Sequence, residues 1–183
     1  MGDLISSDLK DDMKNSWSTD QRVFDSINKE FNFDLDAAAS DDNFKVGHYL
    51  TIKDDSLSVD WSKCSYIYHA KSKQVDCVWI NPPYGRGMIK KFMGKCIEQK
   101  EKGVTSVLLV PATLDAQWLP IQEISEIRII TGGRLSFAHP TTGKKIAGNT
   151  KGSMFVIFRP SKMPCTIRLI DRDELIKSNK ESS

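Results

Sequence analysis

The segment that most constrains the fold is a short apolar run over residues 75–80 that leads into the loop Asn81-Pro82-Pro83-Tyr84. A pattern of apolar residues at helical spacing follows the loop. Proline fixes φ, lacks an N–H and keeps the residue before it extended. The segment therefore predicts a strand, a stiff loop and then a helix, with a side-chain amide and a proline carbonyl at the end of the strand.

The loop of residues 81–84 offers two hydrogen-bond acceptors beside an aromatic ring. The Asn81 side-chain oxygen and the Pro82 carbonyl have no donor within the prolines, which carry no N–H. Two acceptors and a flat ring suit a planar primary amine such as that of adenine, with Tyr84 stacked on the ring. Two prolines after a strand can also form no more than a rigid turn, but the strand before and the helix after favour the chemical interpretation.

Length and composition predict one globular domain. The chain has 183 residues, of which 39% are hydrophobic and 27% charged. No apolar run approaches the roughly 20 residues that cross a bilayer, and the acidic N-terminus lacks the pattern of a signal peptide. We therefore expect a cytoplasmic protein without a membrane segment. We expect residues 1–15 to be a disordered arm, 16–170 the domain, and 171–183 a flexible tail that begins with a short helix.

The cysteines and histidines do not predict a metal site. Four cysteines show no CxxC spacing, and the chain has three histidines. Zinc sites need clustered ligands of these types. Reduced thiols are the expected state.

Charge distribution says more about partners than the net charge of +2. Acidic residues crowd the first third of the chain, and basic residues gather after it. The lysines of residues 90–102 fit a solvated helix face equally well. The candidate phosphate contacts for a nucleic acid are Arg86, Arg134, Lys144, Lys145 and Lys151.

Strands alternate with helices along the chain, which predicts an α/β fold with an open, mostly parallel sheet. The expected strands are residues 31–36, 48–53, 75–80, 104–110 and 126–131, and residues 134–138 and 153–158 form an expected antiparallel C-terminal pair. The expected helices start at Ser18-Thr19, after the 81–84 loop and at Leu114, whereas residues 58–74 look irregular. Ligands of such sheets bind at the carboxyl ends of strands, where Asp36, Asp55 and Asn81 fall.

With these segments in order, the chain resembles the small phage- and prophage-encoded DNA adenine methyltransferases, the phage Dam-like family. The resemblance covers about residues 17–160 and is carried by Trp17-Ser18-Thr19, Phe33-Asp34-Leu35-Asp36-Ala37-Ala38-Ala39, Asp55-Ser56-Leu57 with Trp61, Trp79-Ile80-Asn81-Pro82-Pro83-Tyr84-Gly85, Leu109-Val110-Pro111-Ala112-Thr113 with Trp118, Gly133-Arg134-Leu135-Ser136-Phe137, and Gly152-Ser153-Met154-Phe155-Val156-Ile157-Phe158. Two pieces depart from the usual pattern. Thr19-Asp20 stands where Thr-Pro is common, and alanines follow Asp36 in place of a glycine-rich loop.

The resemblance implies a Rossmann-like methyltransferase fold, S-adenosylmethionine as methyl donor, and double-stranded DNA with a flipped adenine as substrate. It also implies a role in modifying phage DNA or protecting it from restriction. The implied catalytic residues are Asn81, Pro82, Pro83 and Tyr84, and the implied cofactor-binding residues are Thr19, Asp36, Ala37, Asp55 and Asn81.

Simpler roles remain open for several of these side chains. Asp36 and Thr19 are also ordinary helix caps, and Asp55 is also a turn residue. Asn43 is a weaker candidate for contact with a ribose. His139 is interpreted as a turn residue and not as a general base. Trp79, Trp118 and Phe137 are expected in the core.

Two alternative functions also remain open. One is methylation of another planar amine, in an RNA base or a protein glutamine. The other is a non-catalytic DNA-binding, anti-restriction protein on the same fold.

Overall fold

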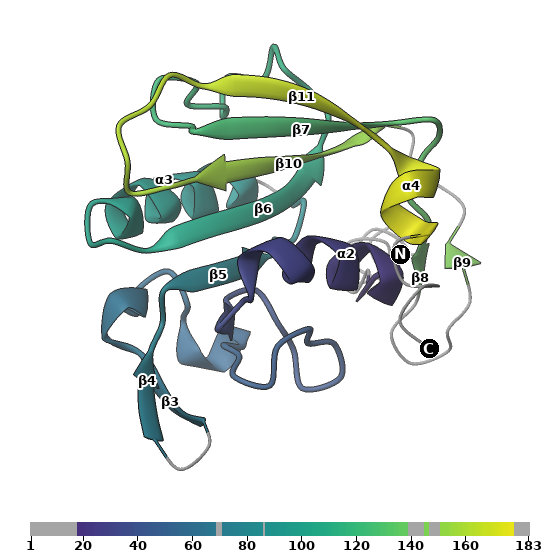
Figure 1. The fold of residues 1–183 in the computed structure, drawn as a ribbon. Helices are drawn as coiled ribbons and strands as arrows, with labels where there is room; N and C mark the ends of the chain where they lie inside the picture. Colours follow the sequence, from purple (N-terminus) through teal and green to yellow (C-terminus); the bar gives the residue numbers. More distant parts are fainter. Residues whose placement is uncertain (1–17, 69–70, 86, 139–144, 147–150, 178–183) are drawn as a thin grey trace, which may run out of the picture.

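A six-stranded sheet forms the centre of the structure, a computed structural model that describes residues 18–68, 71–85, 87–138, 145–146 and 151–177 (Figure 1). The strand order is β11-β7-β10-β6-β5-β2. Their bounds are β2 Leu35–Asp36, β5 Cys77–Ile80, β6 Thr105–Pro111, β7 Glu126–Thr131, β10 Ser153–Phe158 and β11 Thr166–Asp171. Neighbours are parallel except that β10 runs antiparallel to both β6 and β7. The predicted mixed α/β fold, with a mostly parallel sheet, is confirmed.

Helices cover both faces of this sheet. Helix α2 (Gln21–Phe31) and the short α4 (Arg172–Lys177) lie on one face, and α3 (Met88–Lys100) lies on the other (Figure 1). Alternation along β5 divides the core, because successive side chains of a strand point to opposite faces. Val78 and Ile80 pack with α3, whereas Cys77 and Trp79 pack with α2.

The first helix starts later than the sequence pattern predicts. Asp20 is the N-cap of α2 and accepts a hydrogen bond from the Arg22 backbone N–H at 3.0 Å. Residues Ser18–Thr19 form the short strand β1 instead, which pairs antiparallel with β8 (Phe137–Ala138). Strand β8 pairs in turn with β9 (Lys145–Ile146). Strand pairing holds residues 18–19 extended, so the helix begins only after the capping carboxylate.

Two predicted elements are absent. Residues 48–50 run beside β2, but Thr51 and Asp54 then form a capping box around the 3₁₀ helix Ile52–Asp54, which turns the chain away. A strand over residues 48–53 was therefore the wrong prediction. Residues 114–124 form successive turns and no helix, in keeping with a proline that breaks the helical ladder at position 120.

Three further differences concern strand pairing. Residues 58–74, expected to be irregular, contain the 3₁₀ helix Trp61–Lys63 and a hairpin of β3 (Ser65–Tyr68) with β4 (Lys71–Gln74). The expected pairing of residues 134–138 with β10 does not occur, since β10 inserts between β6 and β7. Strand β11 was not predicted, because its mostly exposed side chains give no apolar run.

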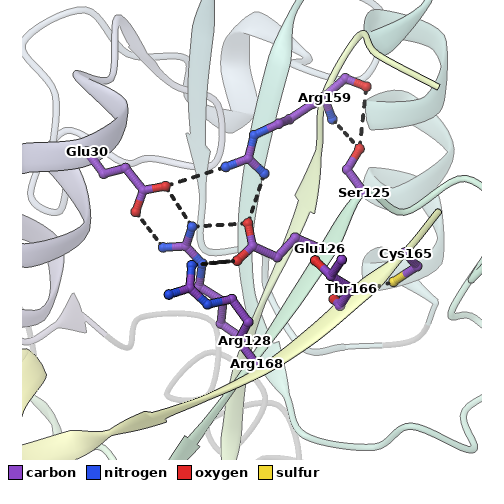
Figure 2. Close-up of polar contacts among 8 residues, drawn as sticks. All are labelled: Glu30, Ser125, Glu126, Arg128, Arg159, Cys165, Thr166 and Arg168. Atoms are coloured by element: carbon purple, nitrogen blue, oxygen red, sulfur yellow. Dashed lines mark hydrogen bonds and ion pairs between the residues drawn. The ribbon is translucent and has the colours of Figure 1, made fainter. Parts of the chain in front are cut away.

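A buried ion-pair network ties α2 to the sheet (Figure 2). Arg128 donates two hydrogen bonds of 2.6 Å to Glu30 and bonds of 2.8 and 3.1 Å to Glu126. Arg159 joins the same two carboxylates, and both guanidinium groups lie over the Phe31 ring. Burial opposes ionisation of Glu126, but the two arginines outweigh it and lower its pKa. The network fixes the C-terminal end of α2 against β7.

Candidate active site

The 81–84 loop sits at the carboxyl end of β5, between β2 and β6 in the sheet. All four residues of β5 are buried, and α3 begins at Met88 after Gly87. Gly87 has φ 77°, a left-handed conformation that glycine adopts without strain. The predicted sequence of strand, stiff loop and helix is thus confirmed.

Asn81 is oriented by Thr19. Its Nδ2 atom donates to Thr19 Oγ1 at 3.2 Å, so the amide oxygen points to the opposite side of the side chain. Strand β1 holds Thr19 in place, and the Thr19 side chain is buried. Thr19 was predicted to lie at a helix N-terminus, but it lies in strand β1, just before the N-cap Asp20, and bonds the amide of the loop. Its contact with a cofactor stays a prediction.

Tyr84 lies beside this amide oxygen. Its hydroxyl is 3.4 Å from Asn81 Oδ1 and 3.5 Å from the Leu109 carbonyl oxygen, both long contacts. Burial raises the pKa of Tyr84 well above its usual value, so the hydroxyl stays protonated. The half-buried Tyr84 side chain contacts Asn81 and also lines a pocket beyond it.

Asp36 ends β2 as a buried carboxylate. Its two oxygens accept backbone N–H bonds from Ala38 at 3.2 Å and Lys45 at 2.9 Å. No helix follows Asp36, so the interpretation as a helix cap is wrong. Burial raises its pKa to about 6, and the two N–H groups oppose this shift. Asp36 thus holds the loop after β2 and stays ionised at neutral pH.

A small polar pocket brings three of the predicted cofactor residues together. We call it the polar pocket; its lining residues are Thr19, Asp36, Ala38, Asn43, Lys45, Trp79 and Asn81. The backbone N–H of Ala37 donates to the Trp79 carbonyl at 3.0 Å, which joins the loop after β2 to β5. Carboxylate, amide, hydroxyl and ammonium groups therefore converge beside Asn81.

A second, mainly apolar pocket of about 270 Å³ adjoins these residues. We call it the apolar pocket; its lining includes Ala37, Ala38, Leu50, Asp55, Leu57, Pro83, Met88 and Phe92. Asp55 is exposed, has φ 48° and accepts a 2.6 Å bond from the Ser58 hydroxyl. Asp55 therefore has the turn role that the sequence offered beside cofactor binding, and it also lines the apolar pocket.

A third pocket of about 380 Å³ lies on the Tyr84 side of the loop. We call it the outer pocket; it is lined by Tyr84, Gly85, Gly87, Ile89, Lys90, Gln117 and Trp118. Trp79 and Phe137 are buried in the core as expected, whereas Trp118 is half-buried and lines this pocket. Trp118 also packs against the hydrophobic core, so its expected core position is confirmed in part.

The predicted nucleic-acid contacts fall partly within the described residues. Arg134 and Lys151 are exposed, and Lys145 lies in β9. Because β8 pairs with β1, the segment that carries these residues starts beside Thr19. Arg86, Lys144 and His139 lie outside the described residues, as do the predicted arm of residues 1–15 and the end of the tail.

The described residues contain no group of three or more His, Cys, Asp or Glu side chains that could hold a metal ion. Within the same residues, no helix is long and apolar enough to cross a membrane. The four cysteines are free thiols.

Comparison with known proteins identifies the family. The family model for DNA N-6-adenine-methyltransferase (Dam) matches residues 6–181. The DNA N-6-adenine-methyltransferase of Haemophilus phage HP1 is 30% identical over 162 residues, which cover 86% of each chain. The protein of that name from Escherichia phage T1 is 30% identical over 169 residues, or 83% of this chain and 66% of its own. This chain belongs to the DNA N-6-adenine-methyltransferase (Dam) family.

Proposed function

We propose that the protein transfers a methyl group from S-adenosylmethionine to the exocyclic amino group of adenine in DNA. The observation that carries the proposal is the orientation of Asn81. Thr19 engages the amide nitrogen, which leaves the amide oxygen beside Tyr84 as the acceptor for a substrate amine. The polar, apolar and outer pockets all adjoin the 81–84 loop. A methyl donor and an acceptor base therefore have separate places beside one amide.

The apolar pocket of about 270 Å³ suits the adenosine portion of S-adenosylmethionine. The polar pocket beside it holds only about 10 Å³, and its charged groups complement the charges of the amino acid portion. Asp55 at the rim of the apolar pocket accepts bonds from ribose hydroxyls in this arrangement, and the small Ala37 lets the ligand approach the backbone. When bound, the donor supplies an electrophilic methyl group on a sulfonium.

The outer pocket suits the target base. A base within a duplex cannot reach such a site, so the adenine must be flipped out, at a cost of a few kcal/mol. Tyr84 and Trp118 offer aromatic faces for stacking, and Gln117 offers polar atoms to the edge of the base. The 81–84 loop then borders both the base in the outer pocket and the donor in the other two pockets.

In this arrangement Asn81 Oδ1 and the Pro82 carbonyl accept the two hydrogens of the amine. The long Tyr84 contact to Asn81 is replaced by the stronger bond to the substrate. The amine lone pair would then point toward the methyl group, the N–C bond would form as the S–C bond of the donor breaks, and the nitrogen would afterwards release one proton to solvent. Holding both reactants in line is the main source of acceleration, since positioning of this kind can contribute about 7–11 kcal/mol.

Basic side chains of residues 134–151, with Arg86, contact the DNA phosphates in this proposal. Arg134 and Lys151 are exposed, which supports these phosphate contacts. Contacts of this kind make the affinity for DNA fall as the salt concentration rises. Because both named relatives come from phages, we place the activity in the cytoplasm of a bacterial host, where it would modify phage DNA or protect it from restriction.

The choice of substrate is tested by supplying labelled donor to DNA, RNA and protein fractions from a host without adenine methylation. We expect label in DNA as N6-methyladenine. Label confined to RNA or to protein glutamine would favour another planar amine. A protein that does not bind the donor in a calorimetric titration would instead fit a non-catalytic DNA-binding role.

Asp36→Asn is expected to weaken donor binding by about 1.5–3 kcal/mol at neutral pH, the range for hydrogen bonds to charged groups. The variant keeps an acceptor for the loop but loses the negative charge that the donor ammonium needs. In the wild type, affinity should fall as pH drops through about 6, because the carboxylate then gains a proton.

Calorimetric titration across pH checks this prediction. Asp41→Asn is the matched control, because Asp41 is exposed in the same loop and should leave affinity unchanged. An Asp36→Asn variant with wild-type affinity at neutral pH would remove Asp36 from the donor site.

Trp118→Ala is expected to lower kcat/KM for DNA about 5- to 100-fold, because stacking of a base on an aromatic ring contributes about 1–3 kcal/mol. Donor binding should not change. Steady-state methylation and donor titration check both parts. Leu114→Ala, an exposed apolar residue of the same segment outside the outer pocket, is the control. Equal kcat/KM for the two variants would show that the base does not stack on Trp118.

A further inference from the structure

The outer pocket has more room than a flipped base needs. Its volume of about 380 Å³ exceeds the 270 Å³ of the apolar pocket, which suits a base together with its ribose. A base alone would therefore leave part of the outer pocket empty. A nucleotide that brings its sugar and a backbone phosphate with it would fill the pocket better.

The lining of the outer pocket offers two kinds of contact. Tyr84 and Trp118 supply aromatic faces, on which a base can stack. Of the charged residues that the structure describes, Lys90 alone lines this pocket. The first turn of α3, in which Lys90 lies, has no acidic residue. The pocket thus combines surfaces for a base with a positive charge, and a negatively charged group of the same ligand would complement that charge.

The Lys90 ammonium is available to such a group. Within the part of the chain that the structure describes, it forms no hydrogen bond or ion pair, whereas Lys95 and Lys100 of the same helix pair with Glu98 and Glu123. The backbone that carries Lys90 is fixed, because α3 packs on the sheet. A cation without a partner is therefore held at the rim of a pocket that suits a base, and each DNA phosphate carries one negative charge.

We propose that Lys90 binds a backbone phosphate next to the flipped adenosine, so that the outer pocket takes a nucleotide and not a base alone. This inference rests on the proposed function and deepens it. The contact differs from those of residues 134–151, because it forms on the flipped nucleotide itself and stabilises the flipped state. Lys90 touches the phosphate but not the reacting amine, so its loss should raise KM for DNA more than it lowers kcat.

The test uses short duplexes that carry the methylated sequence, with a methylphosphonate in place of each of the two phosphates that flank the target adenosine in turn. This replacement removes the charge of one phosphate. For the wild type we expect kcat/KM to fall about 10-fold at one of the two positions, the lower end of the range for hydrogen bonds to charged groups. Lys90→Met should lose about as much on unmodified DNA and respond to the methylphosphonate by about twofold or less. Lys90→Arg, which keeps the charge, should keep most of the response.

Lys91→Met is the matched control, because Lys91 is the next residue of the helix, is equally exposed and does not line the outer pocket. It should respond to the methylphosphonates as the wild type does. A wild type that is indifferent to both methylphosphonates would overturn the inference without any variant. A response of Lys90→Met as large as that of the wild type would overturn it as well. A wild type that leaves the unmodified duplex unmethylated would instead overturn the proposed function, so the two failures are distinguishable.

Discussion

Asn81→Ala is expected to lower kcat on the order of 100- to 1000-fold, the cost of removing one preorganised hydrogen-bonding group from a reacting centre. The variant loses the acceptor that orients the amine, whereas the donor pockets keep their other lining residues. Donor affinity should therefore stay within a few-fold of the wild type. Steady-state methylation of DNA and calorimetric titration of the donor measure the two effects.

Asn81→Asp is the control for this variant. A carboxylate keeps an acceptor at the same position and can still accept a bond from Thr19 Oγ1, so most of the activity should remain. Turnover of Asn81→Ala near that of the wild type would remove Asn81 from the chemistry. A large loss of donor affinity would mean that the side chain mainly binds the donor.

Arg128→Met is expected to destabilise the fold by about 1.5–3 kcal/mol, the range for hydrogen bonds to charged groups, because the buried Glu126 loses its shortest ion pair and keeps Arg159 and Arg168. It also removes the two short bonds to Glu30 on α2 (Figure 2). Urea unfolding monitored by circular dichroism measures this change. The same experiment with added donor shows whether the folded variant still binds.

Arg168→Met is the matched control within the same network. Arg168 is 66% exposed and lies 3.5 Å from Glu126, so its loss should cost no more than about 1 kcal/mol. A similar loss in the free energy of unfolding for the two variants would contradict the expectation that the buried arginine stabilises the fold more than the exposed one.

The sheet was predictable where side chains alone determine a strand. Residues 126–131 were assigned correctly, and the apolar run of residues 104–110 matches β6 within one residue, because both are buried by neighbours on each face. The position of β10 between β6 and β7 depends on pairing between distant segments. The spacing of apolar residues along the sequence does not indicate which segments pair. Strand β11 is mostly exposed at the sheet edge and so lacks an apolar pattern.

The chemistry of the candidate site was predictable from the sequence, but its contacts were not. The sequence singles out Asn81, Asp36 and Thr19, and the fold brings them to one pocket. The role of Thr19 in orienting Asn81 depends on the pairing of β1 with β8, which no local pattern indicates. Lys45 and Gln117 resemble ordinary loop residues in the sequence, and only the three-dimensional arrangement places them in pockets.

The central claim is that the 81–84 loop directs methyl transfer to adenine in DNA. The most direct measurement expresses the wild type and Asn81→Ala in a host without adenine methylation and sequences the DNA with detection of modified bases. The account predicts N6-methyladenine at a recurring sequence with the wild type, and its near absence with the variant at equal protein levels. Unmodified adenine with the folded wild type, or equal modification by both proteins, would contradict it.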